Sequence, residues 1–305
     1  LGLVGAEMCI RDRVGITDLR GLGGDRFVYR VEIEEARDVI HNHTVSWAND
    51  RFEINRTAGF IIPRNNRWTV NVYIAEAPGN TYQGPLRLIP VGLPPGVTMI
   101  APDYKPGMKG VPCQFIAEPG AKPTAMLFHM ELQRLEGDGV IETSSQAYIP
   151  FINHSGGRSW NHVHLQNYAI GVVESSPFTI NVQQPQVPLS QSGELRLKVE
   201  IERHDGFEGA VEMQPDWYSA GVSGGGRLQI PAGKTEAEFV FSASSSAAPG
   251  TYRMSMNGHT MEGDWESGVG VRRVSSDFFE LKVTSPYVSV RFPVSYTHLT
   301  LPTKA

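Results

Sequence analysis

The chain has 305 residues, a formal net charge of −5 and 19% charged residues. This mildly acidic balance, with no run of basic residues, argues against nucleic-acid binding, because phosphate contacts need clustered Lys and Arg. No apolar stretch approaches the roughly 18–20 residues that span a bilayer, so no membrane span is expected in this sequence. The 32 Gly and 21 Pro residues are typical of short strands joined by turns.

The first and last segments of the chain can be encoded by one DNA segment read on opposite strands; the alternative is two unrelated flexible tails. One codon choice for residues 8–12 has a reverse complement that encodes residues 294–298. Both ends also resemble translated sequencing adapter, so we expect adapter-derived tails at residues 1–13 and 293–305 and leave them out of the fold prediction.

Of the two cysteines, Cys9 falls in the first of these tails and Cys113 remains alone. A single cysteine excludes an intrachain disulfide and a cysteine-based metal site. We therefore expect Cys113 to be a small buried hydrophobe rather than a reactive thiol.

An internal repeat covers most of the remaining chain. Residues 84–110 align with residues 209–235 at an offset of 125 positions, which places Gly96 on Gly221. The repeat predicts two successive units that fold alike.

The repeat continues on both sides of that core. Residues 67–74 align with 194–201, and further upstream 52–55 align with 178–181. The first copy is the longer one, which predicts an insertion at about 140–165.

Both copies show the period of two that marks a strand buried on one face. In the second copy the apolar positions alternate with charged ones; they are Leu195, Leu197, Val199 and Ile201. In the first copy the equivalent positions are Trp68, Val70, Val72 and Ile74. A sheet with one apolar face must stack on a second sheet. With no helical period anywhere, the sequence predicts an all-β chain of tandem immunoglobulin-like antiparallel β-sandwiches.

Two resemblances refine this organisation. Residues 14–34, with a Gly-rich turn before an aromatic-rich strand, resemble the last strands of bacterial pre-peptidase C-terminal (PPC) domains. The stretches 203–213, 230–243 and 248–254 are similar to immunoglobulin-like modules of exported bacterial proteins. These resemblances imply export to the periplasm, cell surface or medium, and a non-catalytic role.

The expected organisation follows from the repeat and the resemblances together. A PPC-like end and linker occupy residues 14–46, the first sandwich 47–174 and the second 175–285. A further module begins at 286–292.

Candidate metal ligands occur in two places. His162 and His164 alternate onto one face of a strand, with His154 close by, and imidazoles can bind Zn²⁺ or Cu²⁺. The alternative is a polar, exposed insertion. The twin loops of the repeat also carry carboxylates that could bind Ca²⁺, although Asp and Gly are ordinary turn residues; they are Glu136, Asp138, Glu262 and Asp264. Because both copies place them in the same turn, structure is favoured over catalysis, and no cofactor is expected beyond Ca²⁺ at these loops.

Aromatic residues in predicted loops are the best candidates for ligand binding. Trp217 and Tyr218 are adjacent, and Trp160 and Trp265 lie in polar segments. Exposed indoles stack on sugar rings, whereas the alternative for Trp217 is a plug at the end of the sandwich.

The hypothesis we favour from the sequence is a non-catalytic spacer or adhesion segment of a larger secreted or cell-surface bacterial protein. Its partners would be other domains of the same polypeptide, and an extracellular glycan or surface protein. The alternative is a carbohydrate-binding module that serves an extracellular hydrolase or peptidase. No catalytic residue is assigned.

Overall fold

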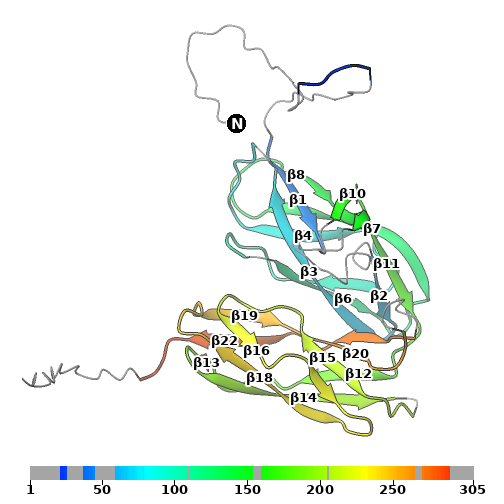
Figure 1. The fold of residues 1–305 in the computed structure, drawn as a ribbon, viewed down its shortest axis with the longest axis vertical. Helices are drawn as coiled ribbons and strands as arrows, with labels where there is room; N and C mark the ends of the chain where they lie inside the picture. The colour runs from blue at the N-terminus through cyan, green and yellow to red at the C-terminus, as the bar shows by residue number, and fades with distance from the viewer. Residues whose placement is uncertain are drawn as a thin grey trace, which may run out of the picture. The chain divides into compact units, whose positions relative to one another are not determined.

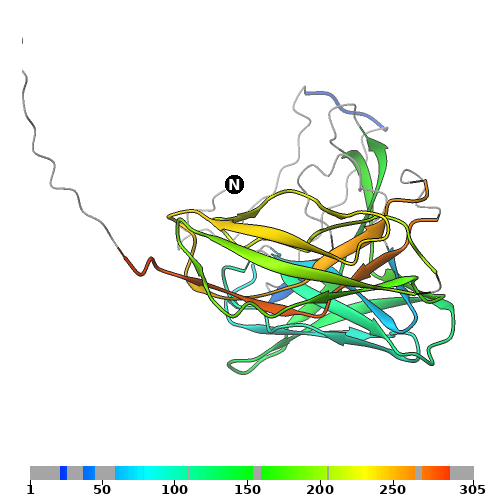
Figure 2. The same cartoon turned by 90° about the horizontal axis from the view of Figure 1, so that it is seen from below.

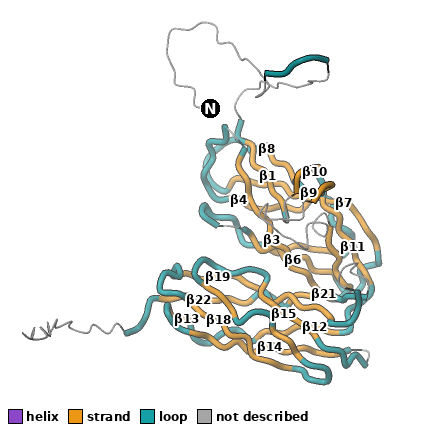
Figure 3. Tube along the Cα trace, in the orientation of Figure 1, coloured by secondary structure: helices purple, strands orange, loops and turns teal. Residues whose placement is uncertain are grey.

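The computed structural model describes residues 21–25, 37–44, 59–77, 79–108, 110–153, 159–204, 206–264 and 270–288; the side chains of residues 148–153 and 159–164 lie outside this description. The described residues form strands, turns and loops without a helix (Figure 3). None of them belongs to a helical segment with the length and hydropathy of a membrane span. The described residues from 37 onward belong to one compact unit, and the fold below is that of this unit.

The first sandwich has two sheets of hydrogen-bonded strands (Figure 1). One sheet has the order β5-β6-β3-β1-β8, with β5 Val97–Ile100, β6 Val111–Ala117, β3 Asn66–Glu76, β1 Val39–His43 and β8 Glu142–Ser145. The other has the order β2-β11-β7-β4, with β2 Gly59–Pro63, β11 Tyr168–Val173, β7 Thr124–Arg134 and β4 Leu86–Val91. β2 and β11 are parallel, whereas β7 pairs antiparallel with both β11 and β4.

The second sandwich, coloured from green to red in Figure 2, is built from three hydrogen-bonded groups of strands. The first has the order β12-β14-β18-β16, with β12 Phe178–Val182, β14 Glu194–Arg203, β18 Glu236–Ala243 and β16 Val222–Gly224. The second is β13-β22-β19, with β13 Leu189–Ser190, β22 Phe279–Thr284 and β19 Gly250–Met254. The third is β17-β15-β20-β21, with β17 Leu228–Ile230, β15 Val211–Pro215, β20 Met256–Thr260 and β21 Arg273–Ser275.

The two sandwiches pair their strands in the same order. β1-β3-β6-β5 corresponds to β12-β14-β18-β16, and the parallel pair β2-β11 corresponds to the parallel pair β13-β22. The prediction from the sequence, an all-β chain of immunoglobulin-like antiparallel sandwiches, is therefore confirmed.

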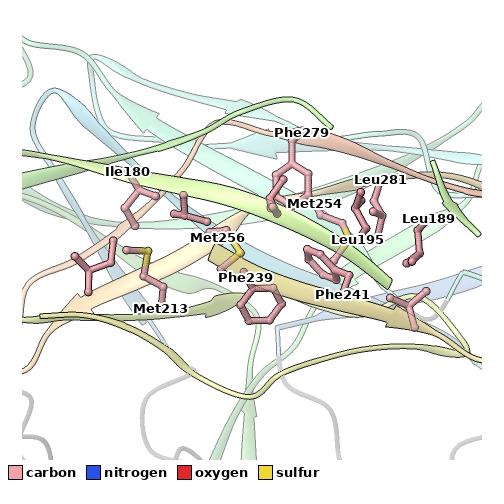
Figure 4. Close-up of a cluster of buried hydrophobic side chains, with 14 of the residues drawn as sticks. Ile180, Leu189, Leu195, Met213, Phe239, Phe241, Met254, Met256, Phe279 and Leu281 are labelled. Carbon is pink, nitrogen blue, oxygen red and sulfur yellow. The ribbon is translucent and has the colours of Figure 1, made fainter. Parts of the chain in front are cut away.

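Each sandwich encloses its own apolar core. In the second, the apolar side chains of β14 alternate inward beside Phe239 and Phe241 of the paired strand β18, and Met254 and Met256 belong to the same core (Figure 4). In the first, Cys113 and Phe115 of β6 face Phe128 and Met130 of β7. Burying an aromatic or large aliphatic side chain stabilises a fold by about 1.5–3 kcal/mol, so these layers hold each sandwich without a disulfide.

Additional strands in the first sandwich lie where the sequence predicts an insertion. β8 follows β7 and pairs parallel with β1, and β9 (Ala147–Asn153) and β10 (Ser159–Leu165) form a hairpin before β11. A buried polar network fixes β8 to the sheet. The Ser145 hydroxyl donates to Oδ1 of Asn42 at 2.9 Å, and the Tyr168 hydroxyl also donates to that oxygen at 2.9 Å.

The start of the first sandwich differs from the expectation. Residues 39–43 fall in the expected linker, yet β1 pairs with β3 from Ile40↔Glu76 to His43↔Tyr73, as β12 pairs with β14. The upstream alignment of 52–55 with 178–181 therefore selects the wrong counterpart of β12, because a four-residue motif cannot fix strand pairing. Residues 52–55 themselves lie outside the described residues, as do the expected tails, most of the PPC-like segment 14–34 and residues 289–292.

The outer side of β3 and β6 is covered by the second sandwich. The side chains of Thr69 and Gln114 are buried, although the alternation predicts solvent on that face. Gln114 Nε2 donates to the main-chain oxygen of Ser276 at 2.9 Å, and Asn257 Nδ2 donates to the main-chain oxygen of Thr69 at 3.2 Å. The expectation of burial on one face only is therefore wrong for this sheet, because the second sandwich replaces the water.

Candidate binding groove

A groove of about 540 Å³ opens where three loops meet at the junction of the two sandwiches. One loop, residues 101–110, joins β5 to β6 of the first sandwich, and the other two flank β16 and β19 of the second. The lining includes Asp103, Lys105, Trp217, Tyr218, Tyr252 and Arg253. Concave sites with aromatic walls and a few polar groups are the usual form of small-ligand sites.

Trp217 is held firmly in the wall of this groove. Its indole Nε1 donates to the main-chain oxygen of Arg253 at 3.0 Å. Its ring meets Tyr252 edge-on at a centroid distance of 6.1 Å, and it packs against the core of the second sandwich. Trp217 is therefore half-buried, so it both closes the end of the sandwich and presents ring surface to the groove.

Each tyrosine of the groove is oriented by a contact within the second sandwich. The Tyr252 hydroxyl donates to the main-chain oxygen of Ala248 at 2.8 Å. Tyr218 is 37% exposed and meets Phe241 edge-on at 6.3 Å, and partial burial raises the pKa of its hydroxyl. Both rings are thus fixed before any ligand arrives, which lowers the entropy cost of binding.

Charged groups of both signs line the rim. Asp103 accepts two hydrogen bonds from Arg87, at 2.8 and 3.0 Å, and this pairing lowers the pKa of its carboxyl. The guanidinium of Arg253 lies over the Phe278 ring at 5.7 Å. The groove therefore offers donors and acceptors beside an aromatic wall.

The candidate ligand-binding residues of the sequence analysis are only partly brought together. Trp217 and Tyr218 line the groove. Trp160 lies in β10 with its side chain outside the description, and Trp265 lies outside the described residues. Tyr252, Arg253 and the 101–110 loop were missed, because a repeat pattern does not reveal which loops of successive units meet.

Neither predicted metal cluster is assembled by the described residues. His162 and His164 lie in β10 with side chains outside the description, and His154 lies outside the described residues. Within the described part of the chain, no three His, Cys, Asp or Glu side chains are grouped to hold an ion.

The turn that carries Glu136 and Asp138 folds around the guanidinium of Arg134. Arg134 approaches Gly139 so closely that a Cβ there would lie 2.7 Å from its Nη1. The same guanidinium lies over the Tyr82 ring at 4.2 Å and pairs with Asp38 at 3.6 Å. In the second copy, the Thr260 hydroxyl donates to the main-chain oxygen of Glu262, and the side chains of Glu262 and Asp264 are exposed. Contacts of this kind, within the chain, are typical of turns that have a structural role.

Cys113 lies on β6 inside the first core, with no exposed surface. Burial raises the pKa of its thiol far above the ordinary value. The expected role as a buried hydrophobe is confirmed, because a thiol that cannot ionise is a poor nucleophile.

No family model matches the chain, and no curated protein matches it. Solved structures with similar arrangements include fibronectin(III)-like modules of CbhA from Clostridium thermocellum, with 11% identity, 79% of this chain and 97% of that chain covered, and a TM-score of 0.23. The D0-D1 domain of intimin is similar at 9% identity, with 73% and 94% covered and a TM-score of 0.24. A DUF3823 family protein from Bacteroides uniformis is similar at 9% identity, with 82% and 100% covered and a TM-score of 0.29. Identities near ten per cent and scores this low assign neither a family nor a ligand to the chain.

Proposed function

We propose that the two sandwiches act together as a rigid, non-catalytic spacer or adhesion segment of a larger exported bacterial protein, working in the periplasm, at the cell surface or outside the cell. The observation that carries the proposal is the junction. Buried polar side chains of one sandwich hydrogen-bond the other, as when Gln114 Nε2 reaches the main-chain oxygen of Ser276 at 2.9 Å. A segment that must hold its neighbours at a fixed spacing needs such a junction.

The short connection between the sandwiches supports the same function. β11 ends at Val173 and β12 begins at Phe178. Asn66 Nδ2 donates to the main-chain oxygen of Phe178 at 3.2 Å, so the first strand of the second sandwich is tied to the first sandwich where it starts. The shared strand order and the sequence repeat together favour two copies of one repeated unit.

The experiment that tests this function is ¹⁵N relaxation of the full chain. A rigid spacer gives one rotational correlation time for the amides of both sandwiches, whereas two freely jointed domains give separate and shorter times. Separate times would contradict the spacer function.

Carbohydrate binding is the second candidate, and the groove favours it. Trp217 and Tyr252 form a pre-oriented aromatic wall, with Asp103 and Arg253 among the polar groups beside it. Sugar rings combine an apolar face with a rim of hydroxyls, so they suit such a wall with nearby donors and acceptors.

Glycan-array binding of the full chain tests this second candidate. Trp217→Phe keeps an aromatic ring in the wall but removes the indole, and Tyr218→Ala removes the exposed ring. The control is Tyr287→Ala, since Tyr287 is exposed but does not line the groove. Binding that both groove variants weaken at least tenfold, and the control leaves unchanged, supports carbohydrate binding. No binding to any glycan, or equal binding by all variants, contradicts it.

A further inference from the structure

The outer edge of β19 lies along the groove. β19 is the last strand of its sheet, which has the order β13-β22-β19, so one side of its main chain faces no strand of that sheet. Thr251 and Arg253 of this strand are exposed and line the groove. The edge can bind a partner only if the N–H and C=O groups of these two residues point into the groove.

Hydrogen bonds on both sides of the sheet fix these directions. In an antiparallel pair, alternate residues direct both main-chain groups toward the partner strand or away from it. Glu280 of β22, which lies opposite Arg253, exchanges two hydrogen bonds with the Gln184 side chain, at 2.8 and 2.9 Å. Glu280 therefore points away from β19, and Arg253 points away from β22. Its oxygen accepts the bond from Trp217 Nε1, as this direction requires, and Thr251, two residues earlier, points the same way.

The same edge is closed farther along the chain, toward β20. The main-chain N–H of Ser255 donates to Asp216 Oδ1 at 2.9 Å, and the main-chain N–H of Asp216 donates to the Ser255 oxygen at 3.0 Å. β15 pairs with β20 up to Pro215↔Met256, so β15 and the two residues after it cover this edge as far as Trp217. Past the Trp217 indole the covering chain leaves the strand.

Three main-chain groups of the edge remain without a hydrogen-bond partner among the described residues. They are the N–H and C=O of Thr251 and the N–H of Arg253. A strand edge with free donors and acceptors is a template for pairing with another extended chain. An added strand would continue the line of β15 along β19, in the space of the groove.

The lining of the groove favours an uncharged segment with apolar side chains. Its charged residues are two acids and two bases, namely Asp103, Glu280, Lys105 and Arg253. Asp103 is held by Arg87, and Glu280 lies opposite Arg253 in the ladder, so a strongly charged partner meets no complementary excess of charge. Prolines and aromatic rings form much of the remaining lining; they include Pro102, Pro106, Pro112, Trp217 and Tyr252.

We propose that β19 accepts an extended, uncharged peptide segment of a partner protein as an added strand, hydrogen-bonded to Thr251 and to the N–H of Arg253, with apolar side chains against Trp217. In this mode of recognition main-chain hydrogen bonds supply affinity, and pockets for alternate side chains supply selectivity. The inference rests on the proposed adhesion function and names its class of partner. Rigidity is measured separately by relaxation, so a rigid chain that binds no peptide contradicts this inference and leaves the spacer function standing.

Amide hydrogen exchange of the full chain is the first test, with decapeptides selected on it from a random displayed library as the probe. In the free chain the N–H groups of Thr251 and Arg253 should exchange rapidly, and that of Tyr252, which faces Leu281 of β22, slowly. Bound peptide should slow exchange at the first two by at least about tenfold. Failure to select a binder, selection of charged sequences, or binders that leave both amides unprotected, as a glycan on the aromatic wall would, overturns the proposal.

The second test removes single main-chain donors. Thr251→Pro deletes an N–H that makes no bond to β22, and an edge strand tolerates Pro, so peptide affinity should fall by about tenfold. Thr251→Val keeps the N–H and should bind within about twofold of the wild type. N-methylation along the peptide is the matching test from the ligand and does not depend on the folding of any variant: alternate amides should be sensitive and the intervening ones tolerant. Equal affinity of the two variants in their folded state, or equal tolerance at every peptide position, overturns the proposal.

Discussion

Thr69 and Ser275, 206 positions apart in the sequence, are joined by a hydrogen bond in which the main-chain N–H of Thr69 donates to the Ser275 hydroxyl at 2.8 Å. The pairing of β1 with β3 ends at Tyr73, and no strand among the described residues continues it along β3 to Thr69. A hydroxyl of the second sandwich completes this edge. Unpaired strand edges favour aggregation, so the junction protects β3 as well as joining the sandwiches.

Replacing Gln114 tests how much the junction stabilises the chain. Gln114 Nε2 donates to Thr69 Oγ1 and to the Ser276 oxygen, both at 2.9 Å. Gln114→Ala removes both bonds and leaves a cavity, so we expect the free energy of unfolding to fall by about 2–3 kcal/mol in urea denaturation. Gln133→Ala, at an exposed position, should change it by less than about 0.5 kcal/mol. Equal small losses would show that the junction contributes little.

Two glycines that the sequence repeat aligns have the same backbone conformation. Gly96 and Gly221 are equivalent in the sequence, and both adopt the left-handed backbone, with φ of +77° and +78°. At Gly221 an added Cβ would also lie 2.6 Å from the Cα of Ala247, whereas at Gly226, with φ of +87°, it would meet nothing within 4 Å.

Gly221→Ala should therefore destabilise the chain by more than the roughly 1 kcal/mol of backbone strain expected for Gly226→Ala. Thermal unfolding of the two variants measures the difference. A Gly221→Ala protein as stable as Gly226→Ala would contradict the close approach of the two turns.

Local patterns in the sequence predict strands and turns, but not which polar residues are buried between domains. The alternation of Leu195, Leu197 and Val199 is a local pattern, and so is the Gly-Val turn that contains Gly221, so strands and turns follow from them. The burial of Thr69 and Gln114 does not follow, because polar residues on an alternating strand read as solvent-facing unless the neighbouring domain is known.

The candidate site shows the same limit. Trp217 and Tyr218 are recognisable as loop aromatics, and the groove does include them. Its other wall comes from residues 101–110, which lie more than a hundred positions earlier and carry no signal of contact with a later loop.

Two partly buried groups, His259 and Asp216, make the free energy of unfolding depend on pH in opposite directions. Burial lowers the pKa of His259 to about 4, below its ordinary 6.5, so His259 takes up a proton more readily unfolded than folded and stability falls as the pH drops from 6.5 to 4. The pKa of Asp216 is raised from 3.8 to about 8, so the folded state holds the extra proton in that window and stability falls as the pH rises through it.

Between about pH 4 and 6.5 these two effects oppose each other. From about pH 6.5 to 8 only the effect of Asp216 remains, and it lowers the free energy of unfolding by about 1.4 kcal/mol per pH unit. We expect the wild type to lose about 2 kcal/mol over that upper range and Asp216→Asn to lose almost none. Urea denaturation at a series of pH values measures both. A wild type as stable at pH 8 as at 6.5 would contradict the raised pKa of Asp216.

The thiol of Cys113 should be inert in the folded chain. It is fully buried, and burial raises its pKa. On a Cys9→Ser background we expect no reaction with a thiol reagent in native buffer and one reacting thiol in denaturant. Rapid native labelling would show that the first core opens.

The fixed arrangement of the two sandwiches can be measured as the distance between spin labels on exposed Lys122 and Gln229, one in each sandwich. The labels are placed in the full chain at neutral pH, with Cys9 replaced by Ser and Cys113 left buried. We predict a single narrow distance distribution, which broadens when Gln114→Ala removes the bonds from the Gln114 side chain to Thr69 and Ser276. A broad distribution in the unsubstituted chain would contradict the rigid junction and the spacer function proposed from it.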